Sequence, residues 1–415
     1  MLTMNEMGKR AKDAARVLAS SESNLRTKAL FALADALEEN CDFILTENEK
    51  DLEAGREKGM SKSLLDRLAL SKERVASMAQ GARQVASFGD PIGTVLSGSV
   101  MPNGLEVTKV RVPLGVIGII YEARPNVTAD AAALCLKSGN AVILRGGKEA
   151  INSNMAVAEV MRKAVKAAGL PEDSIQLVAD TTRQSSIELM GLTDYLDVLI
   201  PRGGAGLIKA TVENAKVPVI ETGTGNCHVY VDEFADLKMA TDIIFNAKTS
   251  RPSVCNAIES VLVHKAVAEK ALPMIKAELD KMNVEIRGCE KTKAILGESI
   301  TDATDEDYAT EFLDYILAVK VVDSIDEAIE HIAKYSTGHS ECIVTESFKN
   351  ANRFTKEVDA AAVYVNASTR FTDGGEFGLG AEIGISTQKL HARGPMGINE
   401  LTRMKFVVKG SGQIR

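Results

Sequence analysis

The chain is predicted to adopt an α/β fold with two doubly wound α/β domains and a small β-hairpin outside them. Three observations predict it. From residue 116 onward, short apolar runs of strand length alternate with helical runs, and this alternation continues through two successive stretches. A length of 415 residues exceeds what one hydrophobic core usually serves. Residues 105–112 alternate strictly between apolar and polar, as in a strand with one solvated face.

The first ninety residues have a helical pattern, with apolar residues at three- and four-residue spacing in 28–37 and again in 71–85. The pattern then changes. Residues 95–101 and 105–112, joined by Pro102-Asn-Gly, predict a β-hairpin. Because its second arm alternates, we expect this hairpin to lie outside the main core.

Two α/β stretches follow. The first predicts strands at 116–121, 141–144, 175–178, 196–200 and 217–220, and helices at 127–137, 149–168, 186–190 and 204–215. The second predicts strands at 228–231, 260–263, 316–321, 342–344 and 362–365, helices at 239–247, 266–282, 326–334 and 349–357, and a final strand at 403–408. Short apolar strands that alternate with helices indicate parallel sheets, which bind ligands beyond the carboxyl ends of their strands.

Composition narrows the classes of partner. An apolar fraction of 45% is that of an ordinary globular protein, and a net charge of −8 disfavours nucleic acid or an anionic membrane as partner. Residues 1–18 mix charged and apolar side chains, unlike a signal peptide, and the apolar runs are too short to cross a bilayer. We therefore expect a cytoplasmic protein.

Six cysteines and five histidines are the residues to examine for reactivity. No CxxC pair occurs and no histidine has triad-like or metal-like spacing, so no metal site is expected. Cys135 and Cys342 lie in apolar runs, as small core residues do. Cys255 differs, because it lies in a polar, proline-containing turn before an apolar strand, and Arg251 beside it would favour a thiolate. From the pattern alone, Cys255 is either a structural thiol or a nucleophile.

Three turns at predicted strand ends carry charge or glycine. Glu221 begins a turn with two glycines. Arg202, Gly203 and Gly204 lead into a helix whose backbone N–H groups could receive a phosphate. Arg145 and Lys148 place two cations after another strand. Each turn is equally compatible with an ordinary solvated connection.

Together these pieces resemble the aldehyde dehydrogenase superfamily over nearly the whole chain. In that superfamily a glutamate on a glycine-containing turn precedes the catalytic cysteine, and Glu221 lies 34 residues before Cys255. Residues 121–126 look like the oxyanion-hole segment, which makes Asn126 the side-chain donor.

Further motifs match the superfamily's cofactor site. Residues 139–145 look like the strand that brings a basic residue, here Arg145, to the cofactor ribose, and Glu311 resembles the glutamate that holds the nicotinamide ribose. NAD-preferring relatives often carry an acid three positions after that basic residue. Lys148 stands there in this chain and suits a 2′-phosphate, so the resemblance implies NADP, bound also by Arg202, Gly203 and Gly204.

Within the superfamily, residues 251–257, 364–380 and 385–397 resemble stretches of the glutamate-5-semialdehyde dehydrogenases. This resemblance implies NADPH-dependent reduction of L-glutamyl 5-phosphate to L-glutamate 5-semialdehyde in proline biosynthesis, with release of phosphate from a thioacyl enzyme on Cys255. Glu221 then either helps to deprotonate Cys255 or serves the structure, since hydrolysis would waste the acyl phosphate. The implied substrate-binding residues are Arg124, Arg251, Ser368, Thr369, Arg370 and Lys389.

The resemblance also implies an organisation. Residues 1–94 and 113–226 would form the NADP-binding domain, 227–398 the catalytic domain, and 95–112 with 399–415 an oligomerisation element. A homodimer or homotetramer is expected. The glutamate 5-kinase that makes the acyl phosphate is a candidate partner, and 415 residues leave no room for it in this chain.

Two rival functions share these motifs. A hydrolytic aldehyde dehydrogenase would use Cys255 and Glu221 to oxidise a free aldehyde, and phosphate dependence separates it from the reductase. A catalytically silent NADP-binding scaffold or sensor would have an unreactive Cys255.

Overall fold

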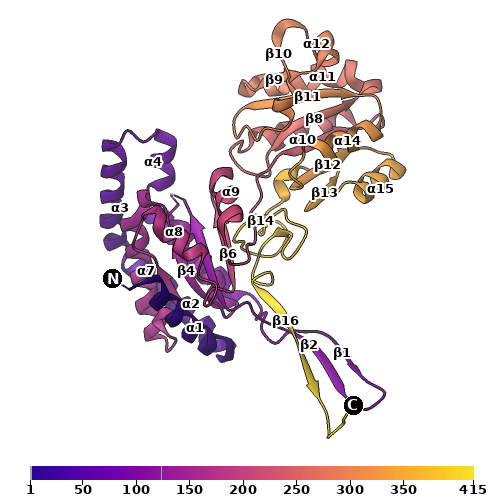
Figure 1. The fold of residues 1–415 in the computed structure, drawn as a ribbon. Coiled ribbons are helices and arrows are strands. Elements are labelled where there is room, and N and C mark those ends of the chain that lie inside the picture. Colours follow the sequence, from indigo (N-terminus) through magenta and orange to yellow (C-terminus); the bar gives the residue numbers. More distant parts are fainter. Residues whose placement is uncertain (1, 123) are drawn as a thin grey trace. The chain divides into compact units, whose positions relative to one another are not determined.

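A computed structural model describes residues 2–122 and 124–415, apart from the side chain of Ser63. The chain divides into two compact units, coloured along the sequence in Figure 1. The first unit contains Met1–Glu221, Gly378–Gly384 and Met396–Arg415, and the second contains Thr222–Phe377 and Ile385–Pro395. Each unit has its own parallel sheet, so the predicted α/β fold is confirmed.

The first unit is built on a parallel sheet with the strand order β5-β4-β3-β6. Its strands are β3 (Val116–Tyr121), β4 (Ala141–Arg145), β5 (Ile175–Leu177) and β6 (Val198–Arg202). Every residue of β3 is buried, which explains why this strand is apolar without alternation. The connections β3–β4 and β4–β5 run in one direction across the sheet, whereas β5–β6 runs back. Right-handed crossovers therefore place the helices of the first two connections on one face and that of the third on the other.

Helices cover this sheet. Before the first strand come α1 (Met4–Ser20), α2 (Ser23–Glu39), α3 (Cys41–Glu57), α4 (Lys62–Leu68) and α5 (Lys72–Ser87). The crossover helices are α6 (Asn126–Lys137), α7 (Ile151–Ala167) and α8 (Arg183–Met190), and β6 leads into α9 (Ala205–Asn214). The helices α2, α3 and α5 pack on α6 and α7, whereas α1 contacts α8. The predicted helical first ninety residues are confirmed.

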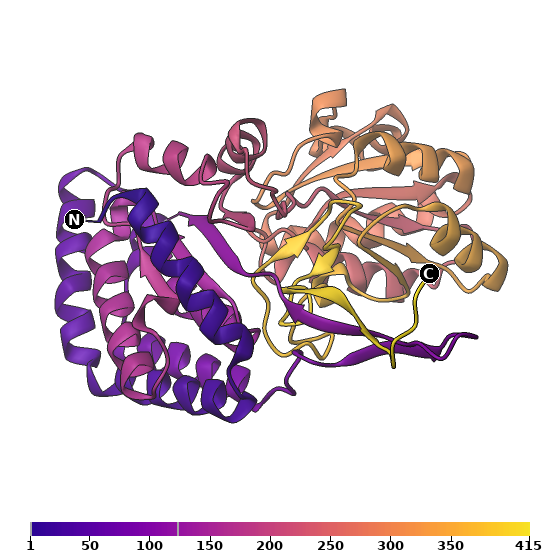
Figure 2. The same ribbon diagram turned by 60° about the horizontal axis from the view of Figure 1, so that its bottom comes forward.

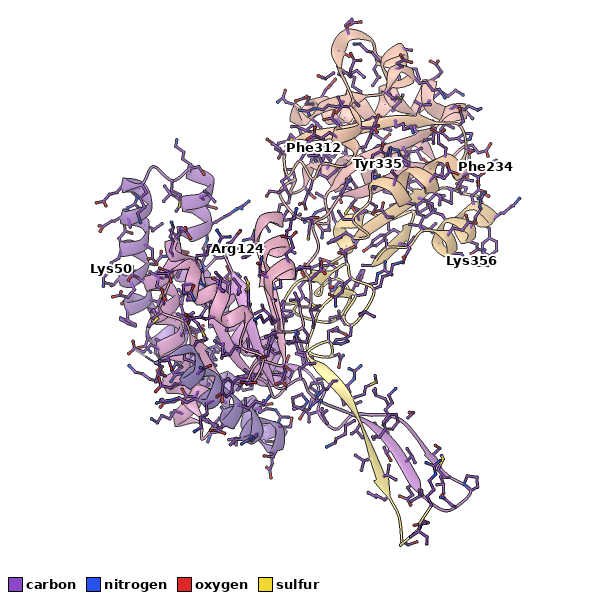
Figure 3. The ribbon with its side chains drawn as sticks, in the orientation of Figure 1. Lys50, Arg124, Phe234, Phe312, Tyr335 and Lys356 are labelled. Atoms are coloured by element: carbon purple, nitrogen blue, oxygen red, sulfur yellow. The ribbon has the colours of Figure 1, made fainter. Side chains whose placement is uncertain are left out.

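The second unit holds a parallel sheet with the strand order β10-β9-β11-β8-β7-β12-β13. Its strands are β7 (Cys227–Val231), β8 (Ile258–His264), β9 (Glu285–Gly288), β10 (Thr301–Asp302), β11 (Ile316–Val322), β12 (Ser340–Val344) and β13 (Ala362–Val365). Its helices are α10 (Leu237–Thr249), α11 (Lys265–Leu279), α12 (Glu290–Leu296), α13 (Asp305–Tyr308), α14 (Ile325–Tyr335) and α15 (Phe348–Glu357). Tyr335, labelled in Figure 3, ends α14 with its ring 4.6 Å from that of His331. A short antiparallel pair, β14 (Ile385–Ser386) and β15 (Gly394–Pro395), completes the unit.

A separate antiparallel sheet joins the predicted hairpin to the C-terminal tail. β2 (Glu106–Pro113) lies between β1 (Val95–Val100) and β16 (Thr402–Lys409), as Figures 1 and 2 show for the purple hairpin and the yellow strand. The predicted hairpin and final strand are confirmed. All six residues of β1 are exposed, so this sheet does lie outside the main cores.

One predicted strand was wrong, and four were missed. Residues 217–220 form only an isolated bridge, Leu199 to Val219, because Pro218 has no N–H to continue a ladder. Two of the missed strands, β9 and β10, are short and lie toward the edge of the second sheet, where charged residues interrupt the apolar pattern. The other two, β14 and β15, have two residues each, too few for a periodic pattern. Among the described residues, no helix is both long enough and apolar enough to cross a membrane.

Candidate active site

Cys255 lies in the turn that connects α10 to β8. The side chain is half-buried, and a hydrogen bond of 3.0 Å from the N–H of Ala257 to the carbonyl of Val254 closes the turn around it. We call residues 250–257 the cysteine loop. A buried helix precedes this loop and a fully buried strand follows it, so both of its ends are anchored.

Residues 368–372 form hydrogen bonds with Asn256 of the cysteine loop. The Asn256 amide donates to the carbonyls of Arg370 (3.2 Å) and Thr372 (3.0 Å), and the Thr369 hydroxyl donates to the Asn256 carbonyl at 2.7 Å. The Arg370 guanidinium donates to the Asn256 side-chain oxygen, and to the Ser250 hydroxyl at 3.0 Å. These bonds fix the residue that follows the candidate nucleophile.

The Arg370 guanidinium lies in the electrostatic environment of Cys255. Burial lowers the pKa of Arg370, the charge of Arg251 lowers it further, and Cys255 acts in the opposite direction. Arg370 therefore interacts with both of the other groups. Neighbouring cations favour the thiolate form of a cysteine, which is its nucleophilic form.

Residues 222–226 contain two glycines, and we call them the glycine turn; Gly225 of this turn packs against the Cys255 backbone. A Cβ on Gly225 would be 1.5 Å from the Cys255 carbonyl oxygen, so only glycine permits this approach. The Cys227 thiol donates to the same carbonyl at 3.2 Å. The Gly225 N–H in turn donates to Glu311 Oε1 at 2.6 Å, and burial raises the pKa of this glutamate. The structure thus places Glu311 against the turn that supports Cys255.

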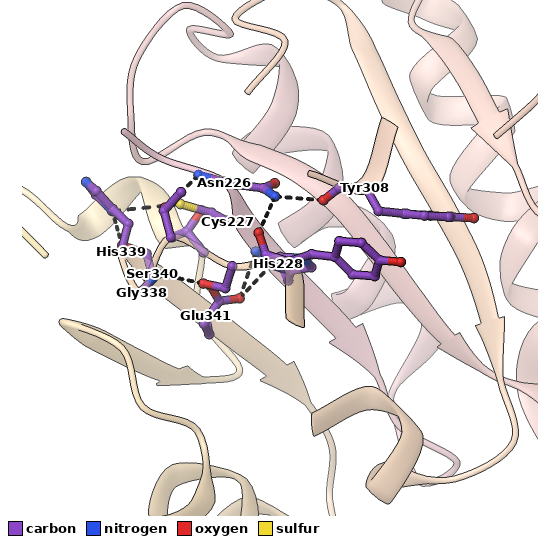
Figure 4. A network of polar contacts seen from close by, with 12 residues as sticks. Asn226, Cys227, His228, Tyr308, Gly338, His339, Ser340 and Glu341 are labelled. Atoms are coloured by element: carbon purple, nitrogen blue, oxygen red, sulfur yellow. Dashed lines mark hydrogen bonds and ion pairs between the residues drawn. The ribbon is translucent and has the colours of Figure 1, made fainter. Parts of the chain in front are cut away.

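Figure 4 shows the polar network that holds the rest of this turn. The Asn226 amide donates to the carbonyls of Tyr308 (2.7 Å) and Tyr335 (2.8 Å). Glu341 accepts from the N–H of His228 at 3.0 Å and from the Ser336 hydroxyl at 2.5 Å. The network joins the start of β7 to the segment before β12, so the turn is supported along its length.

Two buried histidines near this network, His331 and His339, have lowered pKa values. Burial lowers the pKa of His331 to about 3, with His228 as the next cause, and burial lowers the pKa of His339 to about 4. A neutral buried imidazole contributes no positive charge near Cys255.

A cavity of about 260 Å³ in the first unit contains the predicted cofactor cations. It opens at the carboxyl ends of β3 and β4, and its lining includes Tyr121, Arg145, Lys148, Ser186 and Leu207. The Arg145 guanidinium donates to the carbonyls of Thr181 (2.8 Å) and Thr182 (3.0 Å), while its buried Nε has no partner among the described residues. Lys148 is exposed and forms no ion pair within the described part of the chain.

The carboxylate of Glu122 accepts a hydrogen bond at the N-terminus of α9. Glu122 Oε2 accepts from the Gly204 N–H at 3.1 Å, and a Cβ on Gly203 would be 2.6 Å from the Glu122 carboxyl carbon. Gly203 therefore has a packing reason of its own to be glycine. Arg202, the last residue of β6, accepts the Glu122 N–H at its carbonyl, 3.2 Å away.

Asn126 is the first residue of α6, and its side chain is exposed. The amide donates to Asp130 Oδ2 at 3.0 Å, one helical turn further on. Burial raises the pKa of Asp130 to about 6, while the Asn126 amide and Arg202 act in the opposite direction. Arg124, labelled in Figure 3, is exposed in the connection just before this helix.

The remaining predicted substrate residues have other contacts. Thr369 is fully buried, and its hydroxyl bonds to Asn256. Ser368 caps the one-turn helix Thr369–Phe371 by accepting from the Arg370 N–H. Lys389 pairs with Asp359 at 2.6 Å and is 78% exposed. Glu221 is half-buried at the end of the first segment of its unit. Of the predicted set, Thr369 and Arg370 hydrogen-bond to the cysteine loop, and Arg370 also interacts electrostatically with Cys255.

Sequence reasoning missed several residues described in these two units: Glu122, Asp130, Gly225 and Asn256. It also missed a buried ion pair between Lys248 of α10 and Glu259 of β8. A usable signal existed for the pair, since a charged residue inside an apolar helix end or strand needs a partner. No sequence signal pointed to the contact between Glu122 and Gly204, because they are 82 residues apart.

Comparisons with known proteins identify the family. The model of the aldehyde dehydrogenase family matches residues 3–308 and 300–407. γ-Glutamyl phosphate reductase of Heliobacterium modesticaldum is 64% identical over 408 residues, which are 98% of each chain, and that of Clostridium perfringens is 61% identical over the same share. The crystal structure of γ-glutamyl phosphate reductase from Thermotoga maritima has a TM-score of 0.97 at 52% identity and covers 99% of both chains.

These relatives confirm the resemblance to the glutamate-5-semialdehyde dehydrogenases, for which γ-glutamyl phosphate reductase is the other name. The chain therefore belongs to the aldehyde dehydrogenase family, and within that family its relatives are the γ-glutamyl phosphate reductases.

Proposed function

We propose that the protein reduces L-glutamyl 5-phosphate to L-glutamate 5-semialdehyde with NADPH, releasing phosphate, as a step of proline biosynthesis. The observation that carries this proposal is the half-buried Cys255 in the electrostatic environment of Arg370, in a chain 64% identical to a protein of that name. An acyl phosphate is anionic, so Arg251 and Arg370 suit the substrate as well as the thiolate.

In the proposed reaction the Cys255 thiolate attacks the acyl carbonyl carbon. A C–S bond forms, the C–O bond to the phosphate breaks, and phosphate leaves with the bonding electron pair. Asn126 and the Cys255 backbone N–H are the proposed donors to the oxyanion, each worth roughly 3–4 kcal/mol in well-studied sites. The supported glycine turn favours this chemistry because it holds the nucleophile in one geometry.

The first unit fits a nicotinamide cofactor. Its cavity combines an apolar side chain, Leu207, with the cations Arg145 and Lys148 at strand carboxyl ends. Lys148 is the proposed partner of a 2′-phosphate, since it has no ion pair of its own in the described residues. When bound, the cofactor supplies the hydride that reduces the thioester. Gly203, Gly204 and Arg202 can approach its phosphates only if Glu122 leaves the helix N-terminus.

The other parts of the proposal follow the resemblance to the superfamily. The first unit binds cofactor, the second carries catalysis, and the sheet of β1, β2 and β16 joins subunits into a homodimer or homotetramer in the cytoplasm. Glu311 remains a proposed ribose ligand, and glutamate 5-kinase a proposed partner. Glu221 remains either a base for Cys255 or a structural residue.

The test measures NADPH formation from glutamate 5-semialdehyde and NADP, with and without inorganic phosphate, for the wild-type protein and Cys255→Ala. We expect activity that requires phosphate and is lost in the variant. Activity without phosphate would replace the proposal with a hydrolytic dehydrogenase. Cofactor binding without either activity would replace it with another acyl substrate or a silent NADP-binding protein.

A further inference from the structure

A buried ion pair joins the two ends of the cysteine loop. Lys248 lies in the last turn of α10, and Glu259 is the second residue of β8. Both side chains are fully buried, and Lys248 Nζ lies 2.6 Å from Glu259 Oε2. The same ammonium donates to the carbonyl of Ile258 at 3.1 Å. The loop that carries Cys255 is therefore closed by this pair at its base.

The other oxygen of Glu259 reaches a second segment of the site. Glu259 Oε1 accepts from the Leu313 N–H at 3.1 Å. Leu313 has a φ of 56°, a left-handed conformation that is costly for a leucine and persists only where its surroundings impose it. Two residues earlier lies Glu311, which holds the Gly225 N–H. One carboxylate thus connects the base of the cysteine loop to the segment that supports the glycine turn.

Stability alone is a poor reason for this pair. Burying two charges costs several kcal/mol per ion, and well-packed apolar replacements of a buried pair are often neutral or stabilising. Burial raises the pKa of Glu259 and lowers that of Lys248, and the mutual attraction of the two charges opposes both shifts. A pair that contributes little net stability is more readily explained by the geometry it imposes.

We propose that Lys248 and Glu259 are positioning residues that hold the cysteine loop, and with it Cys255, against the Gly225 turn and beside Arg251 and Arg370. This inference rests on the proposed function, in which Cys255 is the nucleophile. Neither residue of the pair touches substrate. They act by fixing both ends of the loop and the Leu313 segment at once.

The test compares Glu259→Gln and the double variant Lys248→Met/Glu259→Leu with the wild-type protein. The double variant removes both charges, so it folds without an unpaired buried ion even where the single variant does not. Asp232→Asn is the matched control: Asp232 is also a fully buried carboxylate of the second unit, and its partners are Tyr230, Thr345 and Asn350, none of them in the cysteine loop.

The measurements are the pH profile of Cys255 alkylation by iodoacetamide, kcat and KM of the phosphate-dependent reaction, and the thermal unfolding midpoint. In both pair variants we expect the alkylation midpoint to rise by about 1 pH unit, since the thiolate loses its placement beside the cations. We expect kcat to fall by about 100-fold, as for an ångström-scale misplacement, with the KM for NADP within about twofold of wild type. Asp232→Asn should lower the unfolding midpoint without moving the alkylation profile.

A folded double variant with wild-type kcat and a wild-type alkylation profile would overturn the positioning role. That role is equally overturned if Asp232→Asn changes both quantities as much as the pair variants do. If the wild-type protein lacks phosphate-dependent activity, the proposed function fails, yet the alkylation profiles still decide whether the pair positions Cys255.

Discussion

At the scale of single residues, burial separates Cys255 from three of the other five thiols. Burial raises the pKa of Cys135, Cys227 and Cys342, the last to about 12, so these three are unreactive thiols at neutral pH. Cys255 is half-buried and interacts electrostatically with the Arg370 guanidinium. A thiol that is accessible and close to cations is the one expected to react first with an electrophile.

The proposed preference for NADPH is assigned to Lys148. Lys148→Glu should raise the KM for NADPH by about 10- to 100-fold, because a charge-assisted bond to the 2′-phosphate is replaced by repulsion. The KM for NADH, which lacks that phosphate, should change far less. Steady-state kinetics with both cofactors measure the difference. Lys216→Glu makes the same charge change outside the cavity and should affect neither value, and equal effects of Lys148→Glu on both cofactors would refute the assignment.

The contribution of Asp130 to folding stability depends on pH, and its raised pKa defines the direction. Its pKa in the folded protein, about 6, exceeds the ordinary value, so folding favours the protonated form. Its contribution to stability is complete below the unfolded pKa of about 3.9 and is lost as pH rises through 6. Asp130→Asn should therefore exceed the wild type in stability at pH 7 to 8, and this gain should vanish near pH 4.

Urea unfolding midpoints between pH 4 and 8 measure this difference. Asp180→Asn is the opposite case, because hydrogen bonds from Thr182 lower the pKa of Asp180. That variant should be less stable than wild type at neutral pH and equal to it at low pH. A difference between Asp130→Asn and wild type that does not vary with pH would contradict the account.

At the scale of elements, the glycine turn limits what can stand beside the cysteine loop. Gly225→Ala would place a Cβ 1.5 Å from the Cys255 carbonyl, so one of the two segments must move. We expect kcat to fall by about 100-fold or more, with a lowered unfolding midpoint. Gly206→Ala is the control. Its added Cβ meets nothing within 4 Å in helix α9, so it should stabilise the protein by up to about 1 kcal/mol. A Gly225→Ala variant with wild-type kcat would show that the turn yields without moving Cys255.

The elements were also where the sequence was most informative. Fully buried parallel strands such as β3 and β8 are continuous apolar runs, and the periodicity of α2 and α14 follows one buried face, so their existence could be predicted. The segment 217–220 has a strand-like pattern and even accepts a hydrogen bond at Pro218, but the missing N–H of that proline ends its pairing. The apolar pattern of a segment does not reveal where a missing N–H ends its pairing with the next strand.

The site was predictable only in part, because its contacts join distant segments. Cys255 could be singled out from its own turn, whereas Asn256 depends on residues 370 and 372, and Gly225 on residue 311. Thr369 illustrates the same point: its motif placed it near the ligand, but its hydroxyl serves the Asn256 carbonyl. Which hydrogen bonds a polar side chain makes is set by the folded neighbours, and no spacing in the chain encodes them.

At the scale of the whole molecule, one surface lacks a partner within the described chain. One face of β16 presents Met404, Phe406 and Val408, which are 54–65% exposed. The Lys109 ammonium lies 5.8 Å from the centre of the Phe406 ring, on the strand paired with it. An exposed apolar row on a sheet with two unpaired edges is a liability unless another chain covers it. This is the physical support for the proposed homo-oligomer.

The oligomer can be tested on that row. Phe406→Asp adds a charge to the apolar face of β16, and burying an unpaired carboxylate in an interface costs several kcal/mol, so the variant should be monomeric at concentrations where the wild-type protein associates. Lys405→Asp, on the opposite face of the same strand, makes a larger change in charge and should leave the association intact. Light scattering coupled to gel filtration gives both masses. A wild-type monomer would refute the oligomer itself, whereas an associated Phe406→Asp variant would place the interface elsewhere on the surface.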